Sequence, residues 1–139
     1  MDNQNLKQRT RQFALEVIKL VERLPSRDIV NDVLGKQLLR SGTSVAANYR
    51  SATRARFPAD FISKMTIVEE EADESVLWID LLEASQRIPG ELARPLMKEA
   101  GELTAIAVAS VRTARANASV PRPVIKNVPR SPLRVPRSK

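Results

Sequence analysis

Hydrophobic residues recur at three- and four-residue spacings through two segments at the start of the chain, which is the period of an α-helix. The first segment ends at Pro25, because a proline drives the preceding residue out of the α region. Its apolar positions are Leu6, Phe13, Val17, Leu20 and Leu24. The second segment runs from about Arg27 to Arg54, and we expect the Ser26 hydroxyl to cap it. Its predicted inward positions are Val30, Leu34, Leu38, Ser41, Val45, Asn48 and Ala52.

Gly42 lies in the middle of the second helical segment. Glycine destabilises a helix interior by about 1 kcal/mol relative to alanine. We therefore expect either a bend at this position or a neighbouring helix that approaches closely.

A third helical segment has two apolar sides, and Pro58 fits its first turn. One side carries Phe61, Met65, Val68, Ala72, Ser75, Ile79 and Leu82. The other carries Ile67, Glu71, Glu74, Trp78 and Leu81. A helix that is apolar on two sides packs in two directions. We expect one side to face the core and the other to contact a second subunit.

Ile88-Pro89-Gly90 interrupts the pattern, and we expect Pro95 to open a fourth helix that ends near Asn117. Its apolar side carries Leu96, Leu103, Ile106, Ser110 and Ala114. Four helices joined by short turns predict an all-α protein, an antiparallel up-down-up-down four-helix bundle over residues 1–118. The 42% content of hydrophobic residues is enough for a core, and few aromatics and glycines favour helix over strand.

The last 21 residues differ in composition from the rest. Residues 119–139 contain five prolines and no acid, so we predict a disordered, basic, proline-rich tail. Its cations are Arg122, Lys126, Arg130, Arg134, Arg137 and Lys139. The tail is either a solvated extension or an arm that binds nucleic acid. The first 118 residues hold 17 cations and 16 acids, so most of the net charge of +7 lies in the tail.

The chain has no histidine and no cysteine, which removes the commonest metal ligands and general base. Carboxylate-bridged metal sites in bundles need Glu-x-x-His motifs, so the acidic run 69–74 does not predict a metal site. We therefore expect no enzyme activity, no metal and no cofactor, and we expect Glu71 and Glu74 to pair with arginines of the second helix. Without a secretory signal or a membrane span, the expected location is the cytoplasm.

The second helix places polar side chains near its packed side. Ser41, Ser44 and Asn48, together with Glu71, Glu74 and Trp78, are candidates for a structural polar network or an interface. Four arginines of this region are candidates for contacts with phosphates, because the guanidinium fork suits phosphate as well as carboxylate. They are Arg40, Arg50, Arg54 and Arg56. Both interpretations stay open.

Two motifs resemble one family. The run Gln37–Arg50, together with Glu69–Ser75 followed by Trp78–Leu82, is similar to the bacterial proteins encoded in intervening sequences of 23S rRNA genes. These are related to the accessory protein of diversity-generating retroelements. The resemblance covers about Leu6–Arg115 and leaves the tail outside. It implies a four-helix bundle that assembles into a homopentamer around a central channel, and retroelement relatives that bind nucleic acid and a reverse transcriptase through basic surfaces.

These observations together predict a non-enzymatic, homo-oligomeric, pentameric bundle that binds RNA or DNA through the four arginines and the tail cations. The alternative is a protein-interaction scaffold or accessory subunit that binds a reverse transcriptase or another protein and no nucleic acid.

Overall fold

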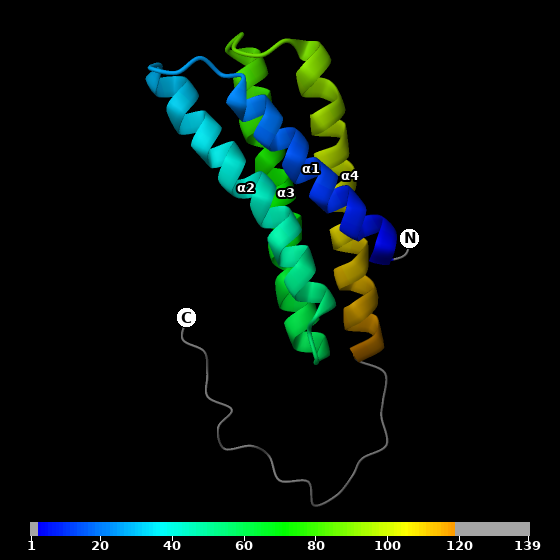
Figure 1. Ribbon diagram of the computed structural model, residues 1–139. Helices are drawn as coiled ribbons and strands as arrows, with labels where there is room; N and C mark the ends of the chain where they lie inside the picture. Colours follow the sequence, from blue (N-terminus) through cyan, green and yellow to red (C-terminus); the bar gives the residue numbers. More distant parts are fainter. Residues whose placement is uncertain (1–2, 119–139) are drawn as a thin grey trace, which may run out of the picture.

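The computed structural model describes residues 3–118, which form four α-helices. The helices are α1 (Asn3–Glu22), α2 (Ile29–Thr53), α3 (Pro58–Ala84) and α4 (Gly90–Ala118). Successive helices run in opposite directions, as Figure 1 shows, so the predicted all-α four-helix bundle is confirmed. The predicted tail over residues 119–139 lies outside the described residues. No helix within residues 3–118 is long and apolar enough to span a membrane.

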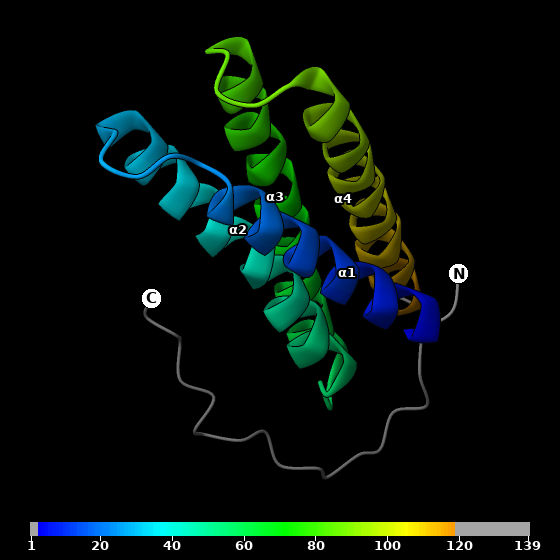
Figure 2. The same cartoon turned by 45° about the horizontal axis from the view of Figure 1, so that its top comes forward.

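The four helices do not pack equally. α3 packs extensively against both α2 and α4, whereas α1 packs mainly on α2 and contacts α4 sparsely. Figures 1 and 2 show α1 running obliquely across the bundle and diverging from α4 toward its own C-terminal end. This divergence leaves a groove between α1 and α4, which is described below.

The inner side of α3 is the part of the core that the sequence pattern predicts best. Six of its seven predicted positions are buried, and the seventh, Phe61, is half-buried. The six buried residues are Met65, Val68, Ala72, Ser75, Ile79 and Leu82. In α2 the prediction is less accurate, because Val30 is 37% exposed and Asn48 is only half-buried. α2 packs between α1 and α3, so its buried arc widens toward α1 and takes in Asn31, Gly35 and Tyr49.

The close approach expected at Gly42 is present. A Cβ atom built on Gly42 would lie 2.8 Å from Cγ2 of Val17 in α1, which is closer than two carbon atoms can pack. α2 runs without interruption through this position. Gly42 therefore serves the contact between α1 and α2 rather than a bend.

The expected starts of two helices are wrong. The cap of α2 is Asp28 rather than Ser26, and its carboxylate accepts hydrogen bonds from the backbone N–H groups of Val30 and Asn31 at 2.9 and 3.0 Å. α4 begins at Gly90 rather than at Pro95. Pro95 is exposed one turn inside α4, where the missing N–H removes a single hydrogen bond on the solvent side.

Candidate nucleic-acid interface

A groove of about 490 Å³ lies between the first half of α1 and the second half of α2. Four of the residues that line it are cations: Lys7, Arg11, Arg50 and Arg54. The remaining lining residues are Thr10, Ala46, Ala47, Tyr49 and Thr53. We call this feature the basic groove.

The helical repeat explains why the four cations meet. Lys7 and Arg11 are four residues apart on α1, and Arg50 and Arg54 are four apart on α2, so each pair projects from one side of its helix. Because the two helices are antiparallel, the first half of α1 lies against the second half of α2. Ala46 and Ala47 have short side chains, which leave the space between the two cationic walls open.

Within residues 3–118, no carboxylate neutralises the basic groove. No acidic residue lines it, and none of its four cations belongs to the ion pairs found within residues 3–118. All four side chains are exposed. Like charges four residues apart on a helix are mildly destabilising. An anionic ligand that reaches this groove therefore does not have to displace any carboxylate of residues 3–118 from these cations.

Other cations of the bundle are engaged. Arg9 joins α1 to α4, with its Nε and Nη2 atoms donating to Glu99 at 2.9 and 2.7 Å and Nη2 also donating to Glu102 at 2.8 Å. These hydrogen bonds, first of all the one to Glu99, raise the pKa of Arg9 above its ordinary value. Arg9 thus fastens two helices together and does not line the basic groove.

Arg40 is engaged as well. Its Nη1 atom donates to both carboxylate oxygens of Glu71 at 3.0 and 3.1 Å, and its Nη2 atom donates to Glu74. The expected pairing of these two carboxylates with an arginine of the second helix is therefore present. Arg40 faces α3, whereas the basic groove lies on the α1 side of α2. Arg40 is therefore not part of the groove.

The candidate polar network divides into separate contacts. The hydroxyl groups of Ser41 and Ser75 are buried and 2.7 Å apart, which links α2 to α3 inside the core. Asn48 donates to the hydroxyl and carbonyl oxygens of Ser44 at 2.8 and 2.9 Å, within α2. Nε1 of Trp78 is buried and has no hydrogen-bond partner in the described part of the chain.

The structure brings together part of the predicted set of phosphate-binding residues. Arg50 and Arg54 line the basic groove, and Arg56 is exposed in the connection after α2. Arg122, Lys126, Arg130, Arg134, Arg137 and Lys139 lie outside the described residues. Sequence reasoning missed Lys7 and Arg11. Their four-residue spacing on the polar side of the first helix was a usable signal, but only the pairing of α1 with α2 shows that they join the arginines.

A second surface lies on the outer side of α2 and α3. Val33 is two turns from Arg40 on α2, and Leu81 is two turns from Glu74 on α3. Since Arg40 contacts Glu74 across antiparallel helices, both apolar residues lie toward the same end of the bundle. Val33 is 51% exposed and Leu81 is 37% exposed. We call this surface the outer α2–α3 face, and its members are Ile29, Val33, Trp78 and Leu81.

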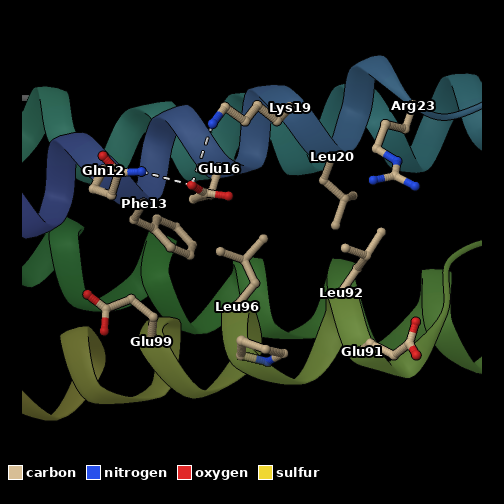
Figure 3. A pocket seen from close by; sticks show the side chains of 11 residues that line it. Gln12, Phe13, Glu16, Lys19, Leu20, Arg23, Glu91, Leu92, Leu96 and Glu99 are labelled. Carbon is tan, nitrogen blue, oxygen red and sulfur yellow. Dashed lines mark hydrogen bonds and ion pairs between the residues drawn. The ribbon is translucent and has the colours of Figure 1, made fainter.

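A third feature is the groove between α1 and α4, which encloses about 410 Å³. Figure 3 shows Phe13 and Leu20 from α1 pointing toward Leu92 and Leu96 from α4. Its rim mixes charges, with Lys19 and Arg23 beside Glu16, Glu91 and Glu99. A mixed rim over an apolar floor does not favour phosphate over other ligands. Within residues 3–118 no group of three acidic side chains is placed to hold a metal ion.

Comparisons with known proteins give one family. A model of the 23S rRNA-intervening sequence protein family matches residues 2–109. A crystal structure of a protein with unknown function from the S23 ribosomal protein family of Bacteroides thetaiotaomicron is 31% identical, with a TM-score of 0.71. The match covers 81% of this chain and 99% of that one. No curated protein matches the chain.

Proposed function

Because the chain belongs to the 23S rRNA-intervening sequence protein family, we propose that it is a homo-oligomeric bundle that binds the phosphate backbone of RNA or DNA. The observation that carries this proposal is the basic groove, where four cations from two helices face solvent without a carboxylate. Arginine and lysine that neutralise phosphates release bound counterions, and this release drives binding. The proposal assigns no catalytic role to any residue.

The basic groove sets a measurable salt dependence. Each phosphate contact contributes about 0.7 to 0.9 to the slope of log affinity against log salt, so four contacts give a slope of about −3 to −4. Arg56 and the six cations of residues 119–139 add to this slope if they reach the same ligand. Deleting residues 119–139 should then make this slope shallower. It should not abolish binding of nucleic acid, because the basic groove remains.

The test removes two groove cations together. Arg50→Ala with Arg54→Ala should weaken binding of an RNA oligomer and make the salt slope shallower by about 1.4 to 1.8. The matched control is Lys98→Ala with Arg112→Ala, which removes the same charge from exposed positions of α4 outside the groove. Affinity is measured by fluorescence anisotropy across a salt series. Equal losses in both double variants would show that net charge, and not the groove, decides binding.

We also propose that copies of the chain assemble through the outer α2–α3 face. Exposed apolar side chains gather there on two adjacent helices, which is uncommon on a surface that only faces water. Trp78 of this face has a buried Nε1 atom with no hydrogen-bond partner within residues 3–118. The family resemblance sets the expected number of subunits at five.

The alternative function is a protein-interaction scaffold or accessory subunit. The α1–α4 groove favours it, because an apolar floor with a mixed-charge rim suits a protein segment better than a phosphate backbone. A reverse transcriptase or another protein is then the partner. A pull-down with this chain that recovers one stoichiometric protein would favour this function over the first, if the chain also has no affinity for RNA or DNA at low salt.

A further inference from the structure

One aromatic ring of the bundle faces solvent. The chain has five aromatic residues, and all of them lie within residues 3–118. Phe13 and Tyr49 are buried, and Phe61 and Trp78 are half-buried against the core. Phe57 is 64% exposed, in the connection between α2 and α3.

The fold does not need a large ring at this position. Phe57 is the N-cap residue of α3, with extended backbone angles of φ −125° and ψ 149°, and its side chain makes no capping hydrogen bond. Only its carbonyl is used, which accepts from the backbone N–H groups of Asp60 and Phe61 at 3.0 and 3.1 Å. Serine, threonine, aspartate or asparagine would supply the same carbonyl and a capping side chain as well.

Phe57 is close along the chain to one end of the basic groove. Arg54 lines the groove, and Phe57 follows it by three residues, a span of at most about 11 Å of chain. Arg56, also exposed, comes between them. Figure 1 shows this connection at the end of the bundle where α4 also ends. A cationic groove that tracks phosphates next to an aromatic ring that stacks on bases is the combination that single-stranded nucleic acids bind.

We propose that Phe57 stacks on an unpaired base of a strand whose phosphates lie in the basic groove. The ligand class is then a single strand, or an unpaired loop, of RNA or DNA, since both offer phosphates and base faces. In a duplex the bases are stacked on one another, so the ring finds no free base face. This inference rests on the proposed function and adds the kind of nucleic acid that the groove takes.

The experiment compares two substitutions of Phe57 in the full chain. Phe57→Leu keeps an apolar side chain and removes the ring, whereas Phe57→Tyr keeps a ring. Binding is measured with single strands of about 16 nucleotides, in RNA and DNA arms, and with the matching duplexes. Phe57→Leu should lose about 5- to 100-fold in affinity for single strands and little for duplexes, and Phe57→Tyr should bind like the unmodified chain.

The salt slope separates stacking from charge. Phe57→Leu should leave the slope unchanged, because the ring contacts no phosphate, whereas Arg54→Ala should make the single-strand slope shallower by about 0.7. Unchanged single-strand affinity in Phe57→Leu, or tighter binding of duplexes by the unmodified chain, overturns the inference and leaves the groove proposal standing. No binding of any nucleic acid at low salt overturns both.

Folding and assembly are checked on the same variants. Because the ring is exposed, Phe57→Leu should keep the helical circular-dichroism spectrum and the melting temperature of the unmodified chain. Light scattering should give the same mass for both. A lower mass for Phe57→Leu would assign the ring to a contact between subunits and overturn the stacking role.

Discussion

The backbone N–H groups of Val30 and Asn31 point out of the first turn of α2, where no preceding turn can accept their hydrogens. The Asp28 carboxylate accepts both, and Nη2 of Arg87 lies 3.5 Å from it. The hydrogen bond from Asn31, followed by the charge of Arg87, lowers the pKa of Asp28 below its ordinary value of 3.8. One side chain thus fixes where α2 begins and makes that start sensitive to acid.

Asp28 therefore carries a prediction about acid stability. A carboxyl whose pKa is lowered in the folded state stabilises the fold above its unfolded pKa, and this contribution is lost as the pH falls through the folded pKa. Asp28→Ala should lower the urea midpoint at pH 7 and lose less stability than the unmodified chain between pH 7 and pH 3. Asp80→Ala, an exposed carboxylate inside α3, is the control. Parallel pH curves for Asp28→Ala and the unmodified chain would contradict the prediction.

Gly42 carries a second prediction at this scale. Replacing a helical glycine by alanine adds about 1 kcal/mol of helix propensity, but the new methyl group of Gly42→Ala would overlap the stiff side chain of Val17. Overpacking of this kind destabilises by about 1–3 kcal/mol, so the net change should be a loss of up to about 2 kcal/mol.

The matched control for Gly42 is Gly101, an exposed glycine of α4 with no atom within 4 Å of the Cβ position. Gly101→Ala should stabilise the chain by about 0.5–1 kcal/mol, since only the propensity changes. Urea unfolding measures the free energy of unfolding, which should fall in Gly42→Ala and rise in Gly101→Ala. Stabilisation by both would mean that α1 moves away from α2 at no measurable cost.

At the scale of elements, α1 is held differently from the other three helices. It packs along α2, and its link to α4 includes the bidentate contact of Arg9 with Glu99 and the contact with Glu102. The C-terminal half of α1 diverges from α4 over the α1–α4 groove. α1 is therefore the helix whose attachment depends most on a single side chain.

Arg9→Ala should loosen α1 more than the rest of the bundle. Hydrogen bonds to charged groups stabilise by about 1.5–3 kcal/mol, and partial exposure of Arg9 places the expected loss near the lower end. Amide hydrogen exchange should quicken in α1 first. Arg11→Ala removes the same charge two residues away without breaking an ion pair within residues 3–118, and it should leave exchange unchanged. Equal exchange in both variants would rule out a fastening role for Arg9.

At the scale of the whole molecule, the surfaces are divided by chemistry. The basic groove lies between α1 and α2, the outer α2–α3 face is apolar, and the α1–α4 groove has a mixed-charge rim. This separation lets a bundle of nearly neutral net charge over its first 118 residues present one cationic surface. It also allows the proposed assembly and the proposed binding of nucleic acid to use different sides of α2.

Assembly is tested by charging the outer α2–α3 face. Light scattering of the unmodified chain should give about five times the 15.5 kDa chain mass. Val33→Lys with Leu81→Lys should give a monomer that keeps its helical spectrum, because both side chains are exposed in the single chain. Leu39→Lys, on another side of α2, should leave the assembly intact. A monomer mass for the unmodified chain at micromolar concentration would refute the assembly.

The helical period and the prolines were enough to predict four helices and the inner side of α3, because these follow from spacing within one segment. At Gly42 the sequence left a bend and a close approach open, and only the contact with Val17 of α1 decides for the approach. Helix starts were predicted less well, since Ser26 and Asp28 both offer a capping side chain before α2, and Pro89 and Pro95 both fit the start of α4. The structure shows that Asp28 caps α2 and that α4 begins at Gly90.

The basic groove could not be predicted from the sequence, because it depends on contacts between segments that are far apart in the chain. Sequence alone made Arg40 and Arg50 equal candidates, but the fold places Arg40 against Glu71 and Glu74 and leaves Arg50 facing solvent. It likewise brings Lys7 and Arg11 to Arg50 and Arg54 across about 40 residues of chain. The sequence by itself determined which side chains carry charge. Only the tertiary structure decided which charges are neutralised and which meet, because both depend on how antiparallel helices align side by side.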